Sequence, residues 1–241
     1  MKKLKIGALM LARSGSSFRN KNIIKISGYP LMAFGMLAAK ETMLIDHYYL
    51  SSDSDEYLKI GEQYGYKSIK RPDAISQSSS KSDDAVLHAF KTVDVLKDCD
   101  ILIVQHANVV TIYPELIIKS IKILSSDKSI TSVVPAHINN EYNPNRSFYL
   151  NNKTIKPFID YNATISPNRQ DLPDAYFLDH SFWCIRTKNL INDYNFSPWN
   201  SLGNKILPIV TKDMFDVHDE GDIKKSIIWL NENKDKTRYL K

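Results

Sequence analysis

Short apolar, β-rich runs alternate along this chain with segments of helical periodicity. The runs at 4–11, 46–51, 101–105 and 129–135 each predict a strand, and the segments at 31–39 and 54–64 predict helices between them. Because such alternation builds βαβ units, the sequence predicts an α/β, Rossmann-like fold with a mostly parallel central sheet and helices on both faces. The 241 residues fit a single domain, 1–241, that is large enough to bury a core.

Several helix ends are marked by residues that favour them. Ser82, followed by two aspartates, predicts an N-cap with an acidic first turn, and Gly65 predicts the C-cap of the helix before it. Thr111 and Pro114 predict the start of another helix, and the pattern at 220–230 predicts a terminal one.

The pattern changes between residues 139 and 171. Asn, Pro, Tyr and Lys dominate there, with short alternating stretches such as 147–159. This composition predicts a β-hairpin excursion from the main domain, used for dimer contacts or as a lid. Alternation resumes at 176–185.

Composition excludes several classes of protein. The net charge of +5 is mild, and no basic tract interleaved with aromatic residues points to nucleic acid. Cys99 and Cys184 have neither disulfide-framework nor metal-site spacing, which favours a reducing compartment. The apolar runs are too short to span a membrane, so we expect a soluble, cytoplasmic protein without membrane or nucleic-acid partners.

A cationic loop follows the first apolar run. It reads Arg-Ser-Gly-Ser-Ser-Phe-Arg-Asn-Lys-Asn over residues 13–22. Gly15 and the serines let the backbone approach a ligand, while Arg13, Arg19 and Lys21 supply positive charge. Backbone N–H groups and cations in such a loop can surround a polyphosphate. An ordinary solvated loop is the alternative explanation.

Motifs in this loop and beyond it resemble those of the acylneuraminate cytidylyltransferases, the CMP-sialic acid synthetases and their legionaminic and pseudaminic acid relatives. The resemblance runs through nearly the whole chain. The matching motifs are Arg13-x-Gly15-Ser16…Lys21-Asn22, Ser51-Ser52-Asp53, Arg71-Pro72, Ser82, His88 and Arg169-Gln170-Asp171-Leu172-Pro173.

The resemblance implies a function that suits these residues. Enzymes of this family join CTP to the anomeric hydroxyl of a nine-carbon keto acid, release pyrophosphate, use a divalent metal and are usually homodimers. Nucleotidyl transfer depends mainly on positioning and on neutralising phosphate charge. The implied partners are therefore CTP, an acidic small-molecule acceptor and a second copy of the chain.

The resemblance also implies site residues. Arg13, Lys21 and Asp216 take catalytic roles. Around the nucleotide it places Ala12, Arg13, Gly15, Ser16, Asn22, Arg71, Ser82 and Gln105. Two departures stand out: Ser17 and Phe18 replace the usual loop lysine, and only Gln105 remains of the family's segment after the third strand, where His106 now stands.

The metal site departs from the family as well. The family's Asp-x-Asp aligns with Asp216-Val217-His218, and Mg²⁺ prefers hard oxygen ligands to imidazole. We therefore expect Mg²⁺ at Asp216, with Mn²⁺ as an alternative if His218 is also a ligand. Asp219 or Asp222 could instead complete the site, or these acids could simply form an acidic helix N-terminus.

On the acceptor side, the resemblance places Arg146, Arg169 and Gln170 near the acid, together with Asp179 and His180. Guanidinium groups bind carboxylates with two parallel hydrogen bonds. His180 is bulkier than the small residue of relatives and indicates an altered acceptor.

Three functions remain open from sequence. The leading one is a CTP-dependent cytidylyltransferase for an acidic sugar of the sialic, legionaminic or pseudaminic type. The second keeps CTP and changes the acceptor to Kdo or to a small phosphorylated or phosphonate compound. The third is a nucleotide-binding protein without catalysis.

Overall fold

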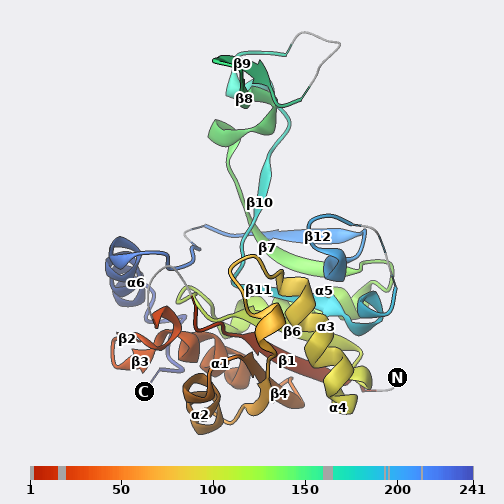
Figure 1. The fold of residues 1–241 in the computed structure, drawn as a ribbon, viewed down its shortest axis with the longest axis vertical. Coiled ribbons are helices and arrows are strands. Elements are labelled where there is room, and N and C mark those ends of the chain that lie inside the picture. The colour runs from red at the N-terminus through yellow and green to blue at the C-terminus, as the bar shows by residue number, and fades with distance from the viewer. Residues whose placement is uncertain are drawn as a thin grey trace.

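An eight-stranded sheet forms the centre of the molecule, with strand order β10-β7-β11-β6-β1-β4-β5 and β12 added beside β7 (Figure 1). The computed structural model describes residues 3–15, 20–159, 165–192, 194, 196–212 and 214–240. The strands of this sheet are β1 (Ile6–Leu11), β4 (His47–Ser52), β5 (Lys67–Lys70), β6 (Ile101–His106), β7 (Ser132–Ile138), β10 (Tyr176–Leu178), β11 (Phe182–Arg186) and β12 (Ile206–Val210).

Neighbouring strands in the β6-β1-β4-β5 half are all parallel, and β12 is parallel to β7. Strand β11 runs antiparallel to both β6 and β7, and β10 runs antiparallel to β7. The predicted α/β fold with a mostly parallel sheet is confirmed.

Both faces of the sheet are covered. Along β1, Ala8 and Met10 belong to one buried cluster, whereas Leu9 and Leu11 belong to another. Successive side chains of a strand point to opposite faces, so the two clusters lie on opposite sides of the sheet. The helices of the first cluster are α1 (Leu31–Glu41), α2 (Asp55–Gln63), α5 (Pro114–Ser126) and α6 (Glu220–Glu232), and those of the second are α3 (Ser82–Thr92) and α4 (Asp94–Lys97).

Shorter elements complete the chain. A small hairpin pairs β2 (Lys25–Ile26) with β3 (Tyr29–Pro30). Short 3-10 helices are η1 (Lys21–Ile23), η2 (Asp73–Ile75), η3 (Asn140–Tyr142), η4 (Pro144–Arg146), η5 (Arg169–Asp171), η6 (Thr187–Leu190) and η7 (Asn200–Leu202). Among the helices of the described residues, none is long and apolar enough to cross a bilayer.

The helix ends follow local chemistry, with one correction. Gly65 has φ +78° and follows α2, where its N–H bonds to Glu62 and the next N–H bonds to Gly61, as in a Schellman C-cap. Ser82, however, is the first helical residue of α3, and the N-cap is Lys81. The prediction was wrong by one residue because Asp84 accepts a hydrogen bond from the Lys81 N–H, which starts the helix earlier.

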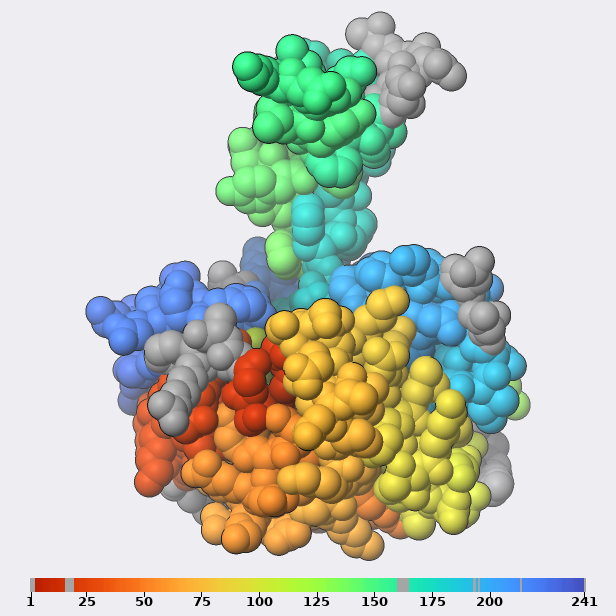
Figure 2. Space-filling view, viewed as in Figure 1, coloured from red at the N-terminus to blue at the C-terminus, as the bar shows by residue number. Residues whose placement is uncertain are grey.

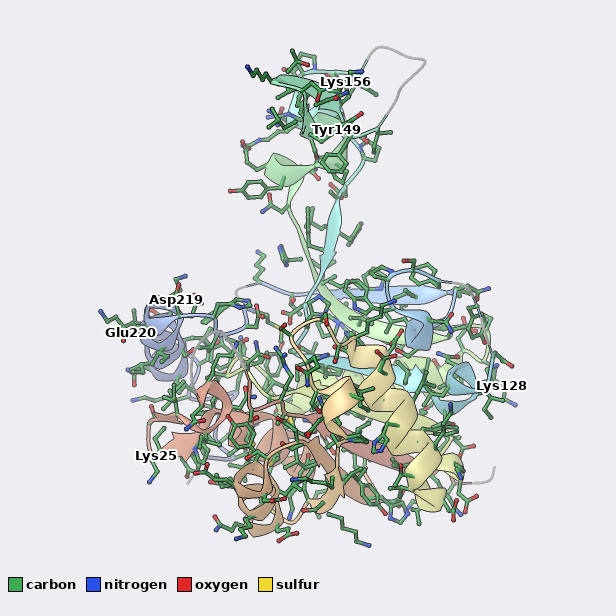
Figure 3. The ribbon with its side chains drawn as sticks, viewed as in Figure 1. Lys25, Lys128, Tyr149, Lys156, Asp219 and Glu220 are labelled. Carbon is green, nitrogen blue, oxygen red and sulfur yellow. The ribbon has the colours of Figure 1, made fainter. Side chains whose placement is uncertain are left out.

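Residues 139–159 and 165–175, between β7 and β10, form an arm that projects away from the eight-stranded sheet and its helices, which are the body of the molecule (Figures 1 and 2). Its hairpin pairs β8 (Phe148–Asn151) with β9 (Thr154–Pro157). The turn residues Asn152 and Lys153 both have positive φ, the geometry that matches the twist of a two-residue hairpin. The hairpin predicted at 147–159 is therefore present, and its paired residues Tyr149 and Lys156 lie in the part of the arm that is distant from the body (Figure 3).

Candidate active site

A cleft opens where the parallel strands end. The carboxyl ends of β1, β5 and β6 meet at one edge of the sheet, which is where ligands bind in open α/β sheets. The cleft has a volume of about 240 Å³ and is lined by Leu11, Arg13, Lys21, Asn22, Arg71, Ile75, Ser80, Lys81, Ser82, Ala85, His106, Ala107 and Asn108.

The loop after β1 brings its cations into the cleft. Lys21, in η1, is only 7% exposed, and burial lowers its pKa, although the negative charge of Asp216 opposes the shift. The Asn22 side-chain amide donates to the Arg13 carbonyl at 3.0 Å, which fixes the two ends of the loop to each other. The Asn22 Oδ1 atom is buried and has no hydrogen-bond partner among the described residues, so it is available as an acceptor for a ligand.

Asp53 anchors the start of the same loop. Its carboxylate accepts hydrogen bonds from the Ser14 backbone N–H, at 2.9 Å, and from the Ser14 hydroxyl. Burial alone would raise the pKa of Asp53, but the bonds from Ser14 outweigh it, and the pKa is lowered. Asp53, the last residue of the Ser51-Ser52-Asp53 motif, therefore holds Ser14 at the start of the cationic loop.

Arg71 closes the other end of the cleft. Its Nε donates to the Ser51 hydroxyl at 3.1 Å and its Nη2 donates to the Ser51 carbonyl at 2.7 Å. Burial lowers the pKa of Arg71 to about 10, so the guanidinium remains charged at neutral pH. Ser82, in the first turn of α3, lines the cleft beside it.

Gln105 is not brought to this cleft. It is fully buried, its Oε1 accepts from the Tyr66 hydroxyl at 2.8 Å, and its Nε2 donates to the Gly35 carbonyl at 2.6 Å. The side chain points from β6 toward α1, and both of its polar groups are used there. The assignment of Gln105 to the nucleotide is corrected accordingly: it fixes α1 to the sheet.

His106, one residue further along β6, faces the cleft instead. Its ring lies 4.9 Å from the Trp183 ring and 5.9 Å from the His180 ring, measured between centroids. Burial lowers the pKa of His106 to about 3, so the imidazole is neutral under ordinary conditions. Polar residues on neighbouring positions of one strand thus serve opposite faces of the sheet.

Three further residues were predicted to lie around the nucleotide, namely Ala12, Gly15 and Ser16. Ala12 is buried, with its N–H bonded to the Ser51 carbonyl, and Gly15 is exposed; neither belongs to the cleft lining. Ser16, together with Ser17, Phe18 and Arg19, lies outside the described residues.

Asp216 lies beside the cleft and is held by its neighbours. It forms an isolated β-bridge with Val109, and its Oδ2 accepts from the Asn108 amide at 3.1 Å. The His218 Nε2 is 2.7 Å from the same Oδ2. In this arrangement Asn108 and His218 both contact Oδ2, and the contacts of Asp216 with the described residues do not involve its other carboxylate oxygen.

The two alternative acids have structural roles. Asp219 is the N-cap of α6 and accepts from the Asp222 N–H at 3.0 Å. Asp222 accepts from the His218 N–H at 2.9 Å and pairs with Lys225 at 2.9 Å. Figure 3 shows Asp219 and Glu220 at the outer start of α6. These contacts match the acidic helix N-terminus that the sequence offered as an alternative.

The donor set suits a magnesium ion held partly by substrate. In the part of the chain that the structure describes, no three His, Cys, Asp or Glu side chains converge as a metal cluster. Asp216 contributes a hard carboxylate oxygen beside a cationic, phosphate-sized cleft. Mg²⁺ in nucleotide sites is commonly bound by one or two carboxylates plus phosphates and waters, so the residues fit the ion.

The predicted acceptor residues fall into two groups. Asp179 and His180 precede β11, at the sheet edge that holds the cleft. Burial raises the pKa of Asp179 and lowers that of His180. Within the described part of the chain, the Asp179 Oδ2 atom has no hydrogen-bond partner. Arg146, Arg169 and Gln170 belong instead to the arm, where Arg169 pairs with Glu141 at 3.1 Å.

Sequence reasoning left several lining residues unassigned. They are Leu11, Ile75, Ser80, Lys81, Ala85, Ala107 and Asn108. Most of them lie at strand ends or in the first turn of α3, so the rule that ligands bind at the carboxyl edge of the sheet could have identified them.

Comparison with known proteins agrees with this geometry. Residues 8–224 match the family described as Cytidylyltransferase. The N-acylneuraminate cytidylyltransferase of Escherichia coli O18:K1:H7 is 33% identical over 87 residues, which cover 36% of this chain and 21% of that protein. The pseudaminic acid cytidylyltransferase of Campylobacter jejuni strain 81-176 is 29% identical over 197 residues, covering 79% of this chain and 83% of that protein.

Coverage of the relatives is uneven. The matches span only 21%, 31% and 32% of the first three curated relatives, so the chain corresponds to a part of those proteins. A solved CMP:2-keto-3-deoxy-manno-octonic acid synthetase complexed with CTP has a TM-score of 0.69 at 15% identity, covering 95% of this chain and 99% of that one. That likeness shows a shared fold.

Proposed function

The chain belongs to the cytidylyltransferase family, and we propose that it transfers CMP from CTP to an acidic sugar of the sialic, legionaminic or pseudaminic acid type. The observation that carries the proposal is the cleft, where Arg13, Lys21 and the free acceptor of Asn22 lie next to Asp216. Cations beside a carboxylate are what a metal-bound triphosphate requires.

In the proposed reaction, the acceptor hydroxyl attacks the α-phosphorus and gives up its proton to solvent, and the bond between that phosphorus and the oxygen bridging to the β-phosphate breaks to release pyrophosphate. Arg13 and Lys21 would neutralise the phosphate oxygens as negative charge moves toward the leaving group. The two described ends of their loop are held by Asp53, at Ser14, and by the bond from Asn22 to the Arg13 carbonyl, so little reorganisation is needed at these ends.

Asp216 would hold Mg²⁺, or Mn²⁺, at the phosphate end of the cleft. The ion, when bound, neutralises phosphate charge and aligns the triphosphate. His218 and Asn108 orient the carboxylate by their contacts with its Oδ2. Such supporting contacts keep a metal ligand in one rotamer and tune its basicity.

The acceptor residues of the arm support a homodimer. Arg146, Arg169 and Gln170 lie on a segment that projects from the body, and none lines the cleft of its own chain (Figure 2). A second copy could bring them to the acceptor end. The arm also exposes large apolar side chains, which favours contact with another protein surface.

The test is pyrophosphate release from CTP with Mg²⁺ and a panel of acids: sialic, legionaminic, pseudaminic, Kdo and a small phosphonate. We expect turnover with one of the nine-carbon acids. Turnover with Kdo or the phosphonate alone would establish the second candidate. CTP binding without turnover on any acid would support a non-catalytic relative.

Two variants connect turnover to the cleft. Arg13→Ala and Lys21→Ala should each lower kcat by about a hundredfold, because each removes an aligned phosphate contact. Lys25→Ala is the matched control, since Lys25 is a nearby exposed cation that does not line the cleft. Near-normal rates in both loop variants would show that the loop is an ordinary solvated surface segment without a role in turnover.

A further inference from the structure

A second cavity lies between α3 and the segment 189–201, apart from the candidate active site. Its volume is about 460 Å³, which is within the range of pockets that hold small molecules. It is lined by Asp83, Leu87, Phe90, Lys91, Asn189, Leu190, Ile191, Asn192, Asn200 and Ser201. None of these residues lines the cleft, so the two cavities are separate.

Asp83 brings a buried negative charge to this second cavity. The residue is 8% exposed, and it forms no ion pair with any residue that the structure describes. Its hydrogen bonds come from Ser201, through the hydroxyl and, at 3.5 Å, the backbone N–H. The positive end of α3 offsets part of the cost of burial, because Asp83 is in the first turn.

Buried carboxylates in proteins normally have a cationic partner. Among the described lining residues, the cation is Lys91, in the last turn of the same helix. The eight residues between it and Asp83 correspond to about 12 Å along the helix axis, which is too far for an ion pair. A cation on a bound ligand would therefore supply the partner that Asp83 lacks.

Asn189 adds a second buried acceptor. The residue is 1% exposed, and its side-chain amide donates to the Thr131 carbonyl at 2.9 Å and to the Ser201 carbonyl at 3.1 Å. These two bonds use the donors of the amide, while its Oδ1 atom is buried without a hydrogen-bond partner in the described part of the chain. Buried polar atoms are normally hydrogen-bonded, so this oxygen also favours a ligand that carries donors.

The remaining lining is largely apolar. Leu87, Phe90, Leu190 and Ile191 contribute hydrocarbon side chains, of which Phe90 is 7% exposed and Ile191 is 75% exposed. A ligand with an apolar body would cover such side chains, and its binding would gain from the apolar surface removed from water. Apolar walls with a few polar groups are the usual composition of a small-molecule site.

We propose that this cavity is a second ligand site, which takes a small organic cation: an ammonium or amidinium group attached to an apolar body. The cationic group pairs with Asp83, a further N–H donor can meet Asn189, and the apolar body lies against Leu87 and Phe90. The site does not depend on the proposed function, because it shares no lining residue with the cleft.

The test uses three probes of similar shape and different charge: 2-phenylethylammonium, 2-phenylethanol and 3-phenylpropanoate. Each is titrated into the ¹⁵N-labelled full chain without nucleotide, and chemical-shift changes give its Kd and the residues affected. We expect the ammonium probe to bind about tenfold more tightly than the alcohol, because a charge-assisted hydrogen bond to the carboxylate is added. The affected residues should be those of the second cavity.

Two variants assign the binding to this cavity. Asp83→Asn should weaken the ammonium probe by about tenfold and change the alcohol by less than about twofold, since the charge is lost while an acceptor for Ser201 remains. Leu87→Trp fills the cavity and should weaken both probes. Asp84→Asn is the matched control, because Asp84 is the next residue of α3, is exposed and is not a lining residue.

The other outcomes overturn the proposal. Equal affinity for the ammonium and the alcohol would mean that the cavity does not recognise charge, and tighter binding of 3-phenylpropanoate would mean that Lys91 dominates it. An ammonium affinity that Asp83→Asn leaves unchanged, or shifts confined to residues of the cleft, would place the binding elsewhere. Absence of binding by the ammonium probe would leave Asp83 as a helix-terminal acid that is bonded to Ser201 alone.

Discussion

The body and the arm differ in how much of their apolar surface is buried. Every residue of β1 is buried, and its two faces pack into two separate clusters under helices. In the arm, all of β9 and most of β8 are exposed. Leu150, in β8, is 75% exposed, and Phe158, just after β9, is 66% exposed. The body forms its own core, whereas the arm leaves apolar groups exposed.

This difference separates stability from recognition. An isolated two-stranded hairpin is marginal in water, so the arm gains little from its internal contacts such as the Tyr149–Phe158 ring pair at 5.6 Å. A large exposed apolar set on a projecting segment indicates an interaction surface. We therefore expect chemistry and stability to depend on the body, and assembly and acceptor recognition to depend on the arm.

The largest effect on turnover should come from substitution of Asp216, the carboxylate beside the cleft in the body. Asp216→Asn should lower turnover by about a thousandfold with Mg²⁺, because it removes the charged oxygen while keeping the shape. Asp219→Asn is the control: asparagine is an equally good N-cap, so α6 and the activity should be retained.

Binding of Mn²⁺ by each variant, followed by electron paramagnetic resonance, gives a readout separate from turnover. Full activity in Asp216→Asn would show that other residues hold the metal. His218→Gln should keep most activity, since a donor to Asp216 Oδ2 remains. An altered Mn²⁺/Mg²⁺ preference in that variant would make His218 a direct ligand.

The next effect compares the same substitution in the two regions. Leu9→Ala should lower the free energy of unfolding by about 2–5 kcal/mol, because Leu9 is fully buried in β1. Leu150→Ala should change it by less than about 0.5 kcal/mol at low protein concentration. Urea unfolding measures both, and equal losses would show that the arm is packed like the body.

The sequence predicted the body well because burial produces strong patterns. The continuous apolar run of β1 and the Ser54 cap of α2 are recognisable without neighbours. Weaker strands were missed: only Ile69 is buried in β5, so its alternation is too short to recognise. The alternating stretch at 176–185 conceals two strands, because the chain leaves β7 at Asp179 and joins β6 from Phe182.

The site was harder to predict because side-chain direction depends on tertiary packing. Gln105 and His106 are both polar and adjacent, yet the first is taken up by Tyr66 and Gly35 and the second lines the cleft. Lys81 lines the cleft as the N-cap of α3, one residue before the predicted cap at Ser82. Residue type alone contains neither fact.

A third, smaller effect tests whether the arm pairs with a second copy. Leu150→Asp should weaken self-association by about tenfold to a hundredfold, because a charge replaces exposed apolar surface at the contact. Sedimentation velocity over a range of concentrations measures it. Ile228→Asp is the control on the body, at a residue that is 56% exposed on α6. Equal weakening in both variants would place the interface outside the arm.

The smallest effect concerns Arg169 and its partner. If the arm supplies acceptor contacts to a second copy, Arg169→Ala should raise the KM for the acid by about tenfold, since a guanidinium–carboxylate contact is lost. The Kd for CTP should stay the same, because Arg169 does not line the cleft.

Glu141→Gln removes the ion pair at 3.1 Å and leaves Arg169 free. An exposed pair of this kind contributes about 0–1 kcal/mol to stability, so Glu141→Gln should leave the melting temperature nearly unchanged and should not raise the KM for the acid. An increase in that KM for both variants would mean that the pair only shapes the arm, whereas an increase for Arg169→Ala alone separates recognition by the arm from catalysis by the body.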